Sequence, residues 1–172
     1  MSSIFQKFGS KSPQYNKKYK ETLFEKFTIK GGGSLEKKRA HGAFFETNYE
    51  FLLYGFFLGL YMDSRLELLP PEKVSFSHQI ENWGSKKITD ARKKFEYIQD
   101  ALFQAAFVKT DIDWLSVEMG DTSVDEAVKK LIQTVEEYAN GGFEFLLDKV
   151  EQRRIIPDEH FFLQLLKESK KK

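Results

Sequence analysis

Apolar residues recur along much of this chain at the three- and four-residue spacing typical of amphipathic helices. Tyr15, Tyr19, Leu23 and Phe27 stand four residues apart, which predicts a helix with one apolar stripe and lysines on its other faces. The same periodicity predicts helices over residues 89–109, 124–139, 143–154 and 157–168.

The most apolar segment, Phe51–Met62 (FLLYGFFLGLYM), lies within a predicted helix from about Phe44 to Asp63. Its twelve residues are too few to cross a hydrocarbon core about 30 Å thick, which needs roughly 20. We therefore expect a central helix surrounded by others. Gly55 and Gly59 lie on one face of this helix, where they would let a neighbouring helix approach closely.

Two motifs predict helix boundaries. Ser123-Val-Asp-Glu126 has the pattern of a capping box, so a helix is expected to begin there. Asn140-Gly141-Gly142 has the composition of a left-handed C-terminal turn, so we expect that helix to end there and another to follow at once.

Two regions lack helical periodicity. Residues 1–13 are polar and are predicted to form a loose arm. Within residues 64–88, Leu66–Leu69 fits a short strand or an extended connector, Pro70-Pro71 stops any helix, and a short helix is expected before Gly84. The sequence contains no convincing pair of strands.

These elements predict an all-α fold, a single-domain bundle of five to six helices. We expect three parts: a basic, partly flexible N-terminal arm with one helix and a glycine-rich loop (1–43), a helical domain (44–169) and a basic tail (170–172).

The distribution of charge adds a second feature. The first 43 residues hold ten Lys or Arg and three Glu, a net charge of +7, so the remaining residues carry −6 within a total of +1. A basic segment of this kind attracts polyanions or the acidic surface of a partner.

Composition narrows the function classes. The absence of cysteine excludes a disulfide framework, a thiol nucleophile and a thiolate metal site. The first residues lack the apolar stretch of a secretory signal, and a cytoplasmic location is expected. Seventeen Phe indicate either a thick core, which we favour, or apolar surfaces that bind a partner.

Residue types that carry catalysis are present but not in a recognisable pattern. His41, His78 and His160 lack the spacing of metal ligands to one another. Asp158 and Glu159 suit the start of a helix, where acids interact favourably with the helix dipole.

Asp111, Asp113 and Glu118 would work as paired carboxylates only if burial or repulsion separated their pKa values. The neighbouring Ile112 and Trp114 favour a structural role, the anchoring of a loop. We therefore expect no enzyme activity, no metal and no cofactor. A site assembled from distant Asp, Glu and His residues is the alternative that stays open.

Two basic clusters are the candidates for binding an anion or a nucleic acid. A glycine-rich turn can direct backbone N–H groups at an anion while lysines neutralise its charge, although the Walker pattern is absent. A flexible hinge beside solvated charges is the favoured alternative for the first cluster. The clusters consist of Gly31, Gly32, Gly33, Lys37, Lys38 and Arg39, and of Lys86, Lys87, Arg92, Lys93 and Lys94.

Two segments resemble a known family. Phe44–Leu60 (FFETNYEFLLYGFFLGL), which follows the glycine-rich loop, and Val135–Leu147 (VEEYANGGFEFLL) are similar to small bacterial accessory proteins of Dnd-type DNA phosphorothioation and restriction systems. The resemblance covers roughly Phe24 to Lys149, and residues 64–115 depart from it. It implies a helical accessory protein in antiviral defence, and it implies no catalytic residues.

The resulting hypothesis is a non-enzymatic accessory subunit of a bacterial DNA-defence complex. It would bind a larger ATPase or nuclease and could contact DNA, with no role for a membrane and an oligomeric state left open. The alternative is a stand-alone nucleic-acid-binding module that uses the basic N-terminal arm without sequence preference.

Overall fold

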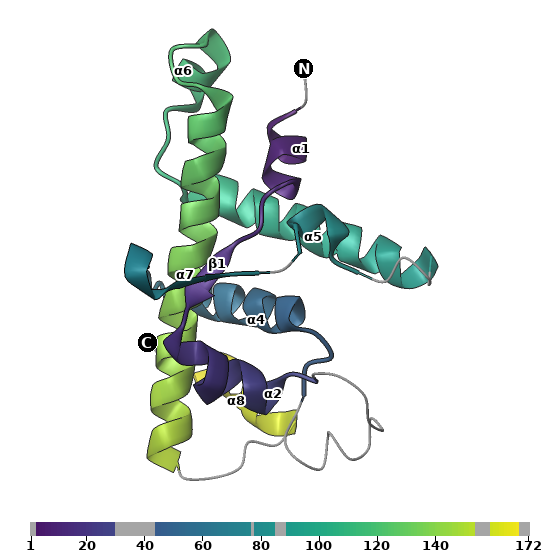
Figure 1. Cartoon of the computed structure of the whole chain (residues 1–172), viewed down its shortest axis with the longest axis vertical. Coiled ribbons are helices and arrows are strands. Elements are labelled where there is room, and N and C mark those ends of the chain that lie inside the picture. Colours follow the sequence, from purple (N-terminus) through teal and green to yellow (C-terminus); the bar gives the residue numbers. More distant parts are fainter. Residues whose placement is uncertain (1–2, 30–43, 77, 85–88, 154–158, 169–172) are drawn as a thin grey trace. The chain divides into compact units, whose positions relative to one another are not determined.

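The computed structural model describes residues 3–29, 44–76, 78–84, 89–153 and 159–168 (Figure 1). Most of these residues are helical, as the periodicity predicts. The elements in chain order are α1 (Ile4–Gly9), β1 (Gln14–Asn16), the π-helix η1 (Lys20–Phe24), α2 (Glu25–Phe27), α4 (Asn48–Tyr61), the 3-10 helix η2 (Pro70–Glu72), β2 (Lys73–Ser75), the 3-10 helix η3 (Ile80–Asn82), α5 (Thr89–Lys109), α6 (Trp114–Met119), α7 (Val124–Arg153) and α8 (Glu159–Glu168).

The prediction of a pure all-α fold is wrong in one respect, because β1 and β2 pair in a two-stranded sheet. Phe76 N donates to Pro13 O at one end and Lys17 N donates to Glu72 O at the other, so the strands run antiparallel. Each strand has only three residues, which is too short for an alternating pattern to be recognised in the sequence.

The chain divides into two compact units, one of Met1–Gln14 with Ser75–Glu136 and one of Tyr15–Val74 with Glu137–Lys172. Helix α7 contributes its first part to one unit and its second part to the other. The predicted boundary after residue 43 and the predicted tail at 170–172 lie outside the described residues.

The first unit packs α1, η3, α5, α6 and the first part of α7. Its core contains Leu102 and Ala106 of α5 and Leu131 of α7, all fully buried. A hydrogen bond of 2.8 Å between the buried hydroxyls of Thr110 and Thr134 joins the end of α5 to α7.

The expectation of a loose arm over residues 1–13 is wrong. Ser3 caps α1 in a complete capping box with Gln6, and Phe8 is fully buried. The Phe5 and Phe8 rings both contact Phe103 of α5 edge-on, at centroid distances of 5.2 and 5.3 Å. Two aromatic anchors thus hold this polar segment on the unit, a role that its composition does not reveal.

The second unit has an aromatic core. Tyr19, Phe24, Phe51, Phe56 and Phe143 are fully buried. Phe143 of α7 lies at its centre, with ring centroids 5.2 Å from Phe24 and 5.1 Å from Phe51. The favoured interpretation of the many phenylalanines as core residues is confirmed for most of those that the structure describes.

The predicted stripe of Tyr15, Tyr19, Leu23 and Phe27 is buried at all four positions, although Tyr15 belongs to β1 rather than to a helix. An α-helix turns by about 400° over four residues, so a strict spacing of four drifts around its surface. Of the four residues, Leu23 lies in the π-helix η1, whose wider turn reduces this drift.

Helix α4 lies within the helix predicted from about Phe44 to Asp63 and begins about four residues later, with Thr47 and Glu50 forming a capping box at its start. Phe57 and Tyr61 of α4 are exposed, so other helices do not surround it on every side. None of the described helices combines the length and the apolarity that a membrane span requires.

The predicted start of α7 is confirmed, since the Ser123 hydroxyl accepts a hydrogen bond of 3.1 Å from Glu126 N. The predicted break at Asn140-Gly141-Gly142 is wrong, because α7 continues through it as one helix of 30 residues. Instead of forming a C-terminal turn, Gly142 allows a close crossing with α4, and Gly141 allows the backbone of Ser64, just after α4, to approach closely.

Candidate functional site

Most of the predicted anion-binding residues lie outside the described part of the chain: Gly31, Gly32, Gly33, Lys37, Lys38, Arg39, Lys86 and Lys87. Arg92, Lys93 and Lys94 belong to the first turns of α5, where the structure describes the backbone and not these side chains. The two basic clusters therefore stay a prediction.

Asp113 is the N-cap of α6, where its carboxylate accepts hydrogen bonds from Leu115 N and Ser116 N. Trp114 stacks on Phe107 of α5, with ring centroids 3.8 Å apart and planes inclined by 13°. These two residues anchor the connector between α5 and α6, as the sequence indicates. No three His, Asp or Glu side chains of the described residues are grouped so that they could hold a metal ion.

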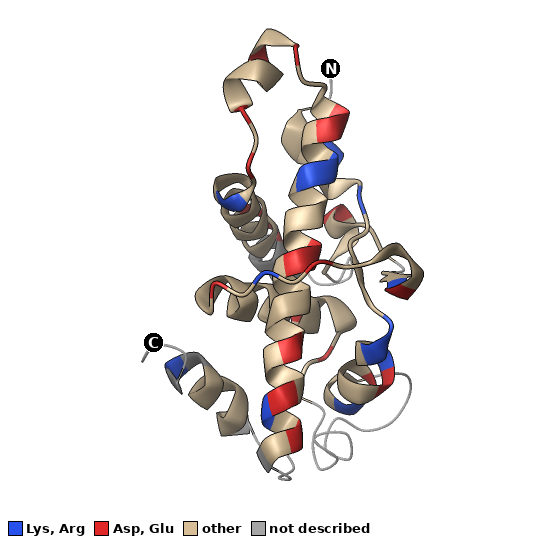
Figure 2. Ribbon diagram, turned by 90° about the vertical axis from the view of Figure 1, so that its left-hand side faces the viewer, with Lys and Arg blue, Asp and Glu red and all other residues tan. Residues whose placement is uncertain are grey.

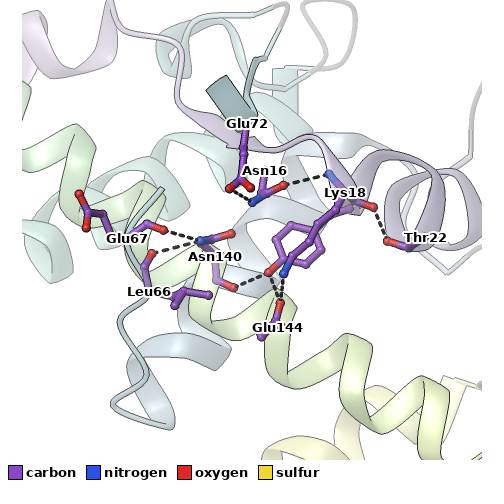
Figure 3. A network of polar contacts seen from close by, with 9 residues as sticks. Asn16, Lys18, Thr22, Leu66, Glu67, Glu72, Asn140 and Glu144 are labelled. Carbon is purple, nitrogen blue, oxygen red and sulfur yellow. Dashed lines mark hydrogen bonds and ion pairs between the residues drawn. The ribbon is translucent and has the colours of Figure 1, made fainter. Parts of the chain in front are cut away.

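A polar network in the second unit connects β1, η1 and α7 (Figure 3). The Tyr19 hydroxyl donates a hydrogen bond of 2.6 Å to Glu144 Oε2, and Lys18 Nζ forms an ion pair with the same oxygen. Next to them, Asn16 Nδ2 donates to Glu72 Oε2 at 2.8 Å and Asn16 Oδ1 accepts from Lys18 N at 3.0 Å.

The electrostatics of this network fit a structural role. Burial and the hydrogen bond to Glu144 raise the pKa of Tyr19 far above its ordinary value, so the phenol keeps its proton at neutral pH. Hydrogen bonds from Lys18 and Tyr19 lower the pKa of Glu144. Within the network, the protonated phenol of Tyr19 donates and the ionised carboxylate of Glu144 accepts. This hydrogen bond helps to tie β1 and η1 to α7.

Asn140 ties the segment after α4 to α7. Its Nδ2 donates to the carbonyl oxygens of Leu66 and Glu67, both at 3.2 Å, as Figure 3 shows. Its Oδ1 is buried and has no hydrogen-bond donor among the described residues. Arg65 forms an ion pair with Glu137 of α7, and the extended backbone of residues 64–69 thus lies along α7 as a connector.

Three glycines, Gly55, Gly59 and Gly142, allow α4 and α7 to cross with their backbones in contact. A Cβ atom at Gly59 would overlap the carbonyl oxygen of Tyr138, and one at Gly142 would overlap the carbonyl oxygen of Gly55. At Gly55 an added Cβ would lie 2.5 Å from the Phe143 ring. The close approach predicted from Gly55 and Gly59 is confirmed, and this crossing is a structural element of the second unit.

In the first unit, the short helix α6 is capped at both of its ends. Asp113 caps its N-terminus, and Gly120 ends it in the left-handed conformation with φ of 85°. Asp121 N and Thr122 N both donate to Ser116 O. Trp114, Ser116 and Val117 are half-buried, so the side of this short helix that carries Leu115, Glu118 and Met119 points away from the core.

The exposed side of α6 carries two large apolar residues. Leu115 and Met119 are separated by one helical turn and are 62% and 69% exposed. Residues four apart lie on the same face of a helix, and Glu118 lies beside them. We call Leu115, Glu118 and Met119 the α6 face. Large apolar side chains this exposed on a well-capped helix are typical of an interaction surface.

Acidic residues surround the α6 face. Residues 110–126 contain six Asp or Glu and no Lys or Arg, and Figure 2 shows these acidic positions on α6, on the turns that flank it and at the start of α7. Only Asp125 forms an ion pair with another described residue, at 2.9 Å from Lys7 Nζ, and this lysine lowers the pKa of Asp125. Asp111, Glu118 and Asp121 are exposed.

From the sequence, Asp111, Asp113 and Glu118 are candidates only for catalysis or anchoring, and this surface is not predicted. Two signals for it were present: a run of 17 residues with six acids and no base, and Leu115 and Met119 at helical spacing within that run. Their exposure was not predictable, because it depends on which side of α6 the Trp114 ring fixes to α5.

No protein-family model matches this chain, and no curated protein or solved structure matches it significantly.

Proposed function

We propose that this chain is a helical accessory subunit of a bacterial DNA-defence complex, and that it acts by binding a larger ATPase or nuclease rather than by catalysis. The observation that supports binding is the α6 face, where Leu115 and Met119 are more than half exposed on a helix fixed at both ends. The resemblance of Phe44–Leu60 and Val135–Leu147 to Dnd-type accessory proteins supports the cellular setting.

Isolation of the tagged full chain from its native host tests this proposal. The lysate is treated with a nuclease, so that proteins joined only by DNA are lost, and the retained proteins are identified and quantified by mass spectrometry. We expect one ATPase or nuclease in a fixed ratio to the chain. Recovery of the chain alone, across several lysis conditions, would contradict the proposal.

A second candidate function is sequence-independent binding of nucleic acid. The observation that favours it is the net charge of +7 within the first 43 residues, together with the exposure of Lys17, Lys20 and Lys26. Lysines of this kind neutralise phosphates and release counterions, so the affinity would fall steeply with salt.

A further inference from the structure

We propose that the α6 face binds a basic amphipathic helix of a partner protein. This inference rests on the proposed function, because it names the chemistry of the segment through which a partner would be held. It depends on three features of the first unit: the capped backbone of α6, the exposed apolar pair and the nearby acids.

The capped backbone of α6 matters because a helix that is already formed does not have to fold when a partner binds. The Asp113 cap, the Gly120 turn and the stacking of Trp114 on Phe107 fix the backbone that carries the apolar pair. A preformed surface loses less conformational entropy on binding than a mobile one, so a small apolar contact gives more affinity.

The apolar pair indicates a helical occupant. Leu115 and Met119 form one ridge along α6, and a partner helix can place its own apolar side chains on both sides of such a ridge. Methionine is flexible and polarisable, which suits a surface that adapts to the side chains it meets.

The charge indicates a basic occupant. Six acids without a base in residues 110–126 create a negative field, and the exposed Asp111, Glu118 and Asp121 lie within four residues of Leu115 or Met119 in the sequence. Lysines and arginines on the rim of a partner helix would meet these carboxylates. The same field repels DNA phosphates, and it repels the α6 face of a second copy of this chain.

The probe for the first test is a fluorescein-labelled 18-residue peptide of leucine and lysine, with the leucines at helical spacing. Its controls are a shuffled peptide of the same composition and a leucine–glutamate peptide with the same apolar pattern. We expect the leucine–lysine peptide to bind the full chain at least about tenfold more tightly than either control. In amide NMR spectra, the shifts should change in α6 and in the first turn of α7.

Two variants test the apolar pair. Leu115→Asn with Met119→Gln should weaken binding of the peptide by at least about tenfold. Leu163→Asn is the matched control, since Leu163 is 58% exposed on α8, and it should bind as the wild type does. Circular dichroism melts of both variants establish that they fold, since exposed positions of this kind contribute little to stability.

A charge variant tests the acids. Neutralising three carboxylates near the α6 face should weaken binding and make it less sensitive to salt between about 0.1 and 1 M, where the Debye length falls from about 10 to 3 Å. A control variant that neutralises three exposed carboxylates elsewhere should leave both the affinity for the peptide and its sensitivity to salt unchanged. The test variant combines Asp111→Asn, Glu118→Gln and Asp121→Asn. The control variant combines Glu21→Gln, Asp100→Asn and Glu151→Gln.

Three results would overturn the inference: equal binding of the leucine–glutamate or shuffled peptide, shift changes outside α6 and α7, or a folded Leu115→Asn, Met119→Gln variant that binds normally. Concentration-dependent dimerisation through α6 would also overturn it in favour of a second copy. If the native pull-down yields a partner while the peptide fails, the accessory function stands and this surface does not serve it. If the peptide binds α6 as expected but no partner is recovered, the accessory function fails.

Discussion

Asn140 shows how much one side chain contributes at the middle of α7. It is 2% exposed, and its amide nitrogen is the donor for two backbone carbonyl groups of the connector after α4. Partly buried carbonyl groups that lose their protein donor are destabilised to the extent that water does not replace it. The connector therefore depends on the amide, which no other side chain type of this size can replace.

We expect Asn140→Asp to lower the free energy of unfolding by about 3–5 kcal/mol, because it places an unpaired carboxylate against two carbonyl oxygens. Asn140→Ala should cost less, about 1–3 kcal/mol, since it only removes the donor. Urea unfolding at pH 7 measures both. The difference in stability between the two variants should narrow in acid, where the protonated carboxyl of Asn140→Asp can donate a hydrogen bond to a carbonyl oxygen. Equal losses of stability in the two variants at pH 7 would contradict this account.

Glu144 gives the stability a dependence on pH. Lys18 and Tyr19 lower the pKa of this carboxyl below its ordinary value of 4.5. The ionised group therefore stabilises the folded state above that pH, and the stabilisation is lost as the pH falls through the lowered value.

We expect Glu144→Gln to destabilise the protein by about 1 kcal/mol or less at pH 7, because the lost ion pair is partly exposed. The difference from the wild type should disappear in acid, below the folded-state pKa, as urea unfolding at a series of pH values would show. Glu21→Gln, at an exposed position, is the control. A difference that stays constant across the series would mean that the carboxylate charge is not the cause.

At the scale of elements, the crossing of α4 and α7 depends on the absence of side chains. Gly59→Ala would place a methyl group into the Tyr138 carbonyl oxygen. We expect a loss of about 2 kcal/mol or more, since overpacking outweighs the roughly 1 kcal/mol that alanine gains over glycine in a helix.

Thermal and urea unfolding measure this effect, and Gly9→Ala is the matched control. At Gly9, the last residue of α1, an added Cβ would lie 3.4 Å from the Glu81 Cβ, an ordinary contact, so Gly9→Ala should leave the stability unchanged or raise it by up to about 1 kcal/mol. A Gly59→Ala variant as stable as the control would show that the two helices can separate without cost.

The helices were largely predictable from the sequence, since α5 and the start of α7 follow the apolar periodicity and the Ser123 cap. The break at Asn140-Gly141-Gly142 was not, because a glycine that ends a helix and a glycine that packs against another backbone look the same locally. Whether these glycines end the helix or pack against another backbone depends on Gly55, Gly59 and Ser64, which lie far away in the sequence. The pairing of β1 with β2 and the burial of Phe8 depend on distant partners in the same way.

At the scale of the whole molecule, the basic region is not a detachable arm. It includes Phe8, Tyr19 and Phe24, which are fully buried, so deletion of the first 43 residues would remove part of the core. Nucleic-acid binding is better tested by charge substitutions in the full chain.

We expect Lys37→Gln, Lys38→Gln, Arg39→Gln to weaken binding to a DNA duplex if the basic region contacts phosphates. The slope of log affinity against log salt should become shallower by about 2 to 3, since each phosphate contact contributes about 0.9. Fluorescence anisotropy over a salt series measures this, with Lys129→Gln, Lys130→Gln on α7 as the control. An unchanged slope would exclude these three residues from the contact.

The glycine crossing also has a consequence for synthesis on the ribosome. Helix α4 is complete at Tyr61, whereas Gly141, Gly142 and Phe143 emerge roughly 80 residues later, a delay of about 4 to 16 s at 5 to 20 residues per second. During that time the most apolar helix of the chain has none of its α7 partners. The nascent protein must therefore keep this segment from aggregating, and a chaperone that binds apolar segments would act on α4 before α7 is made.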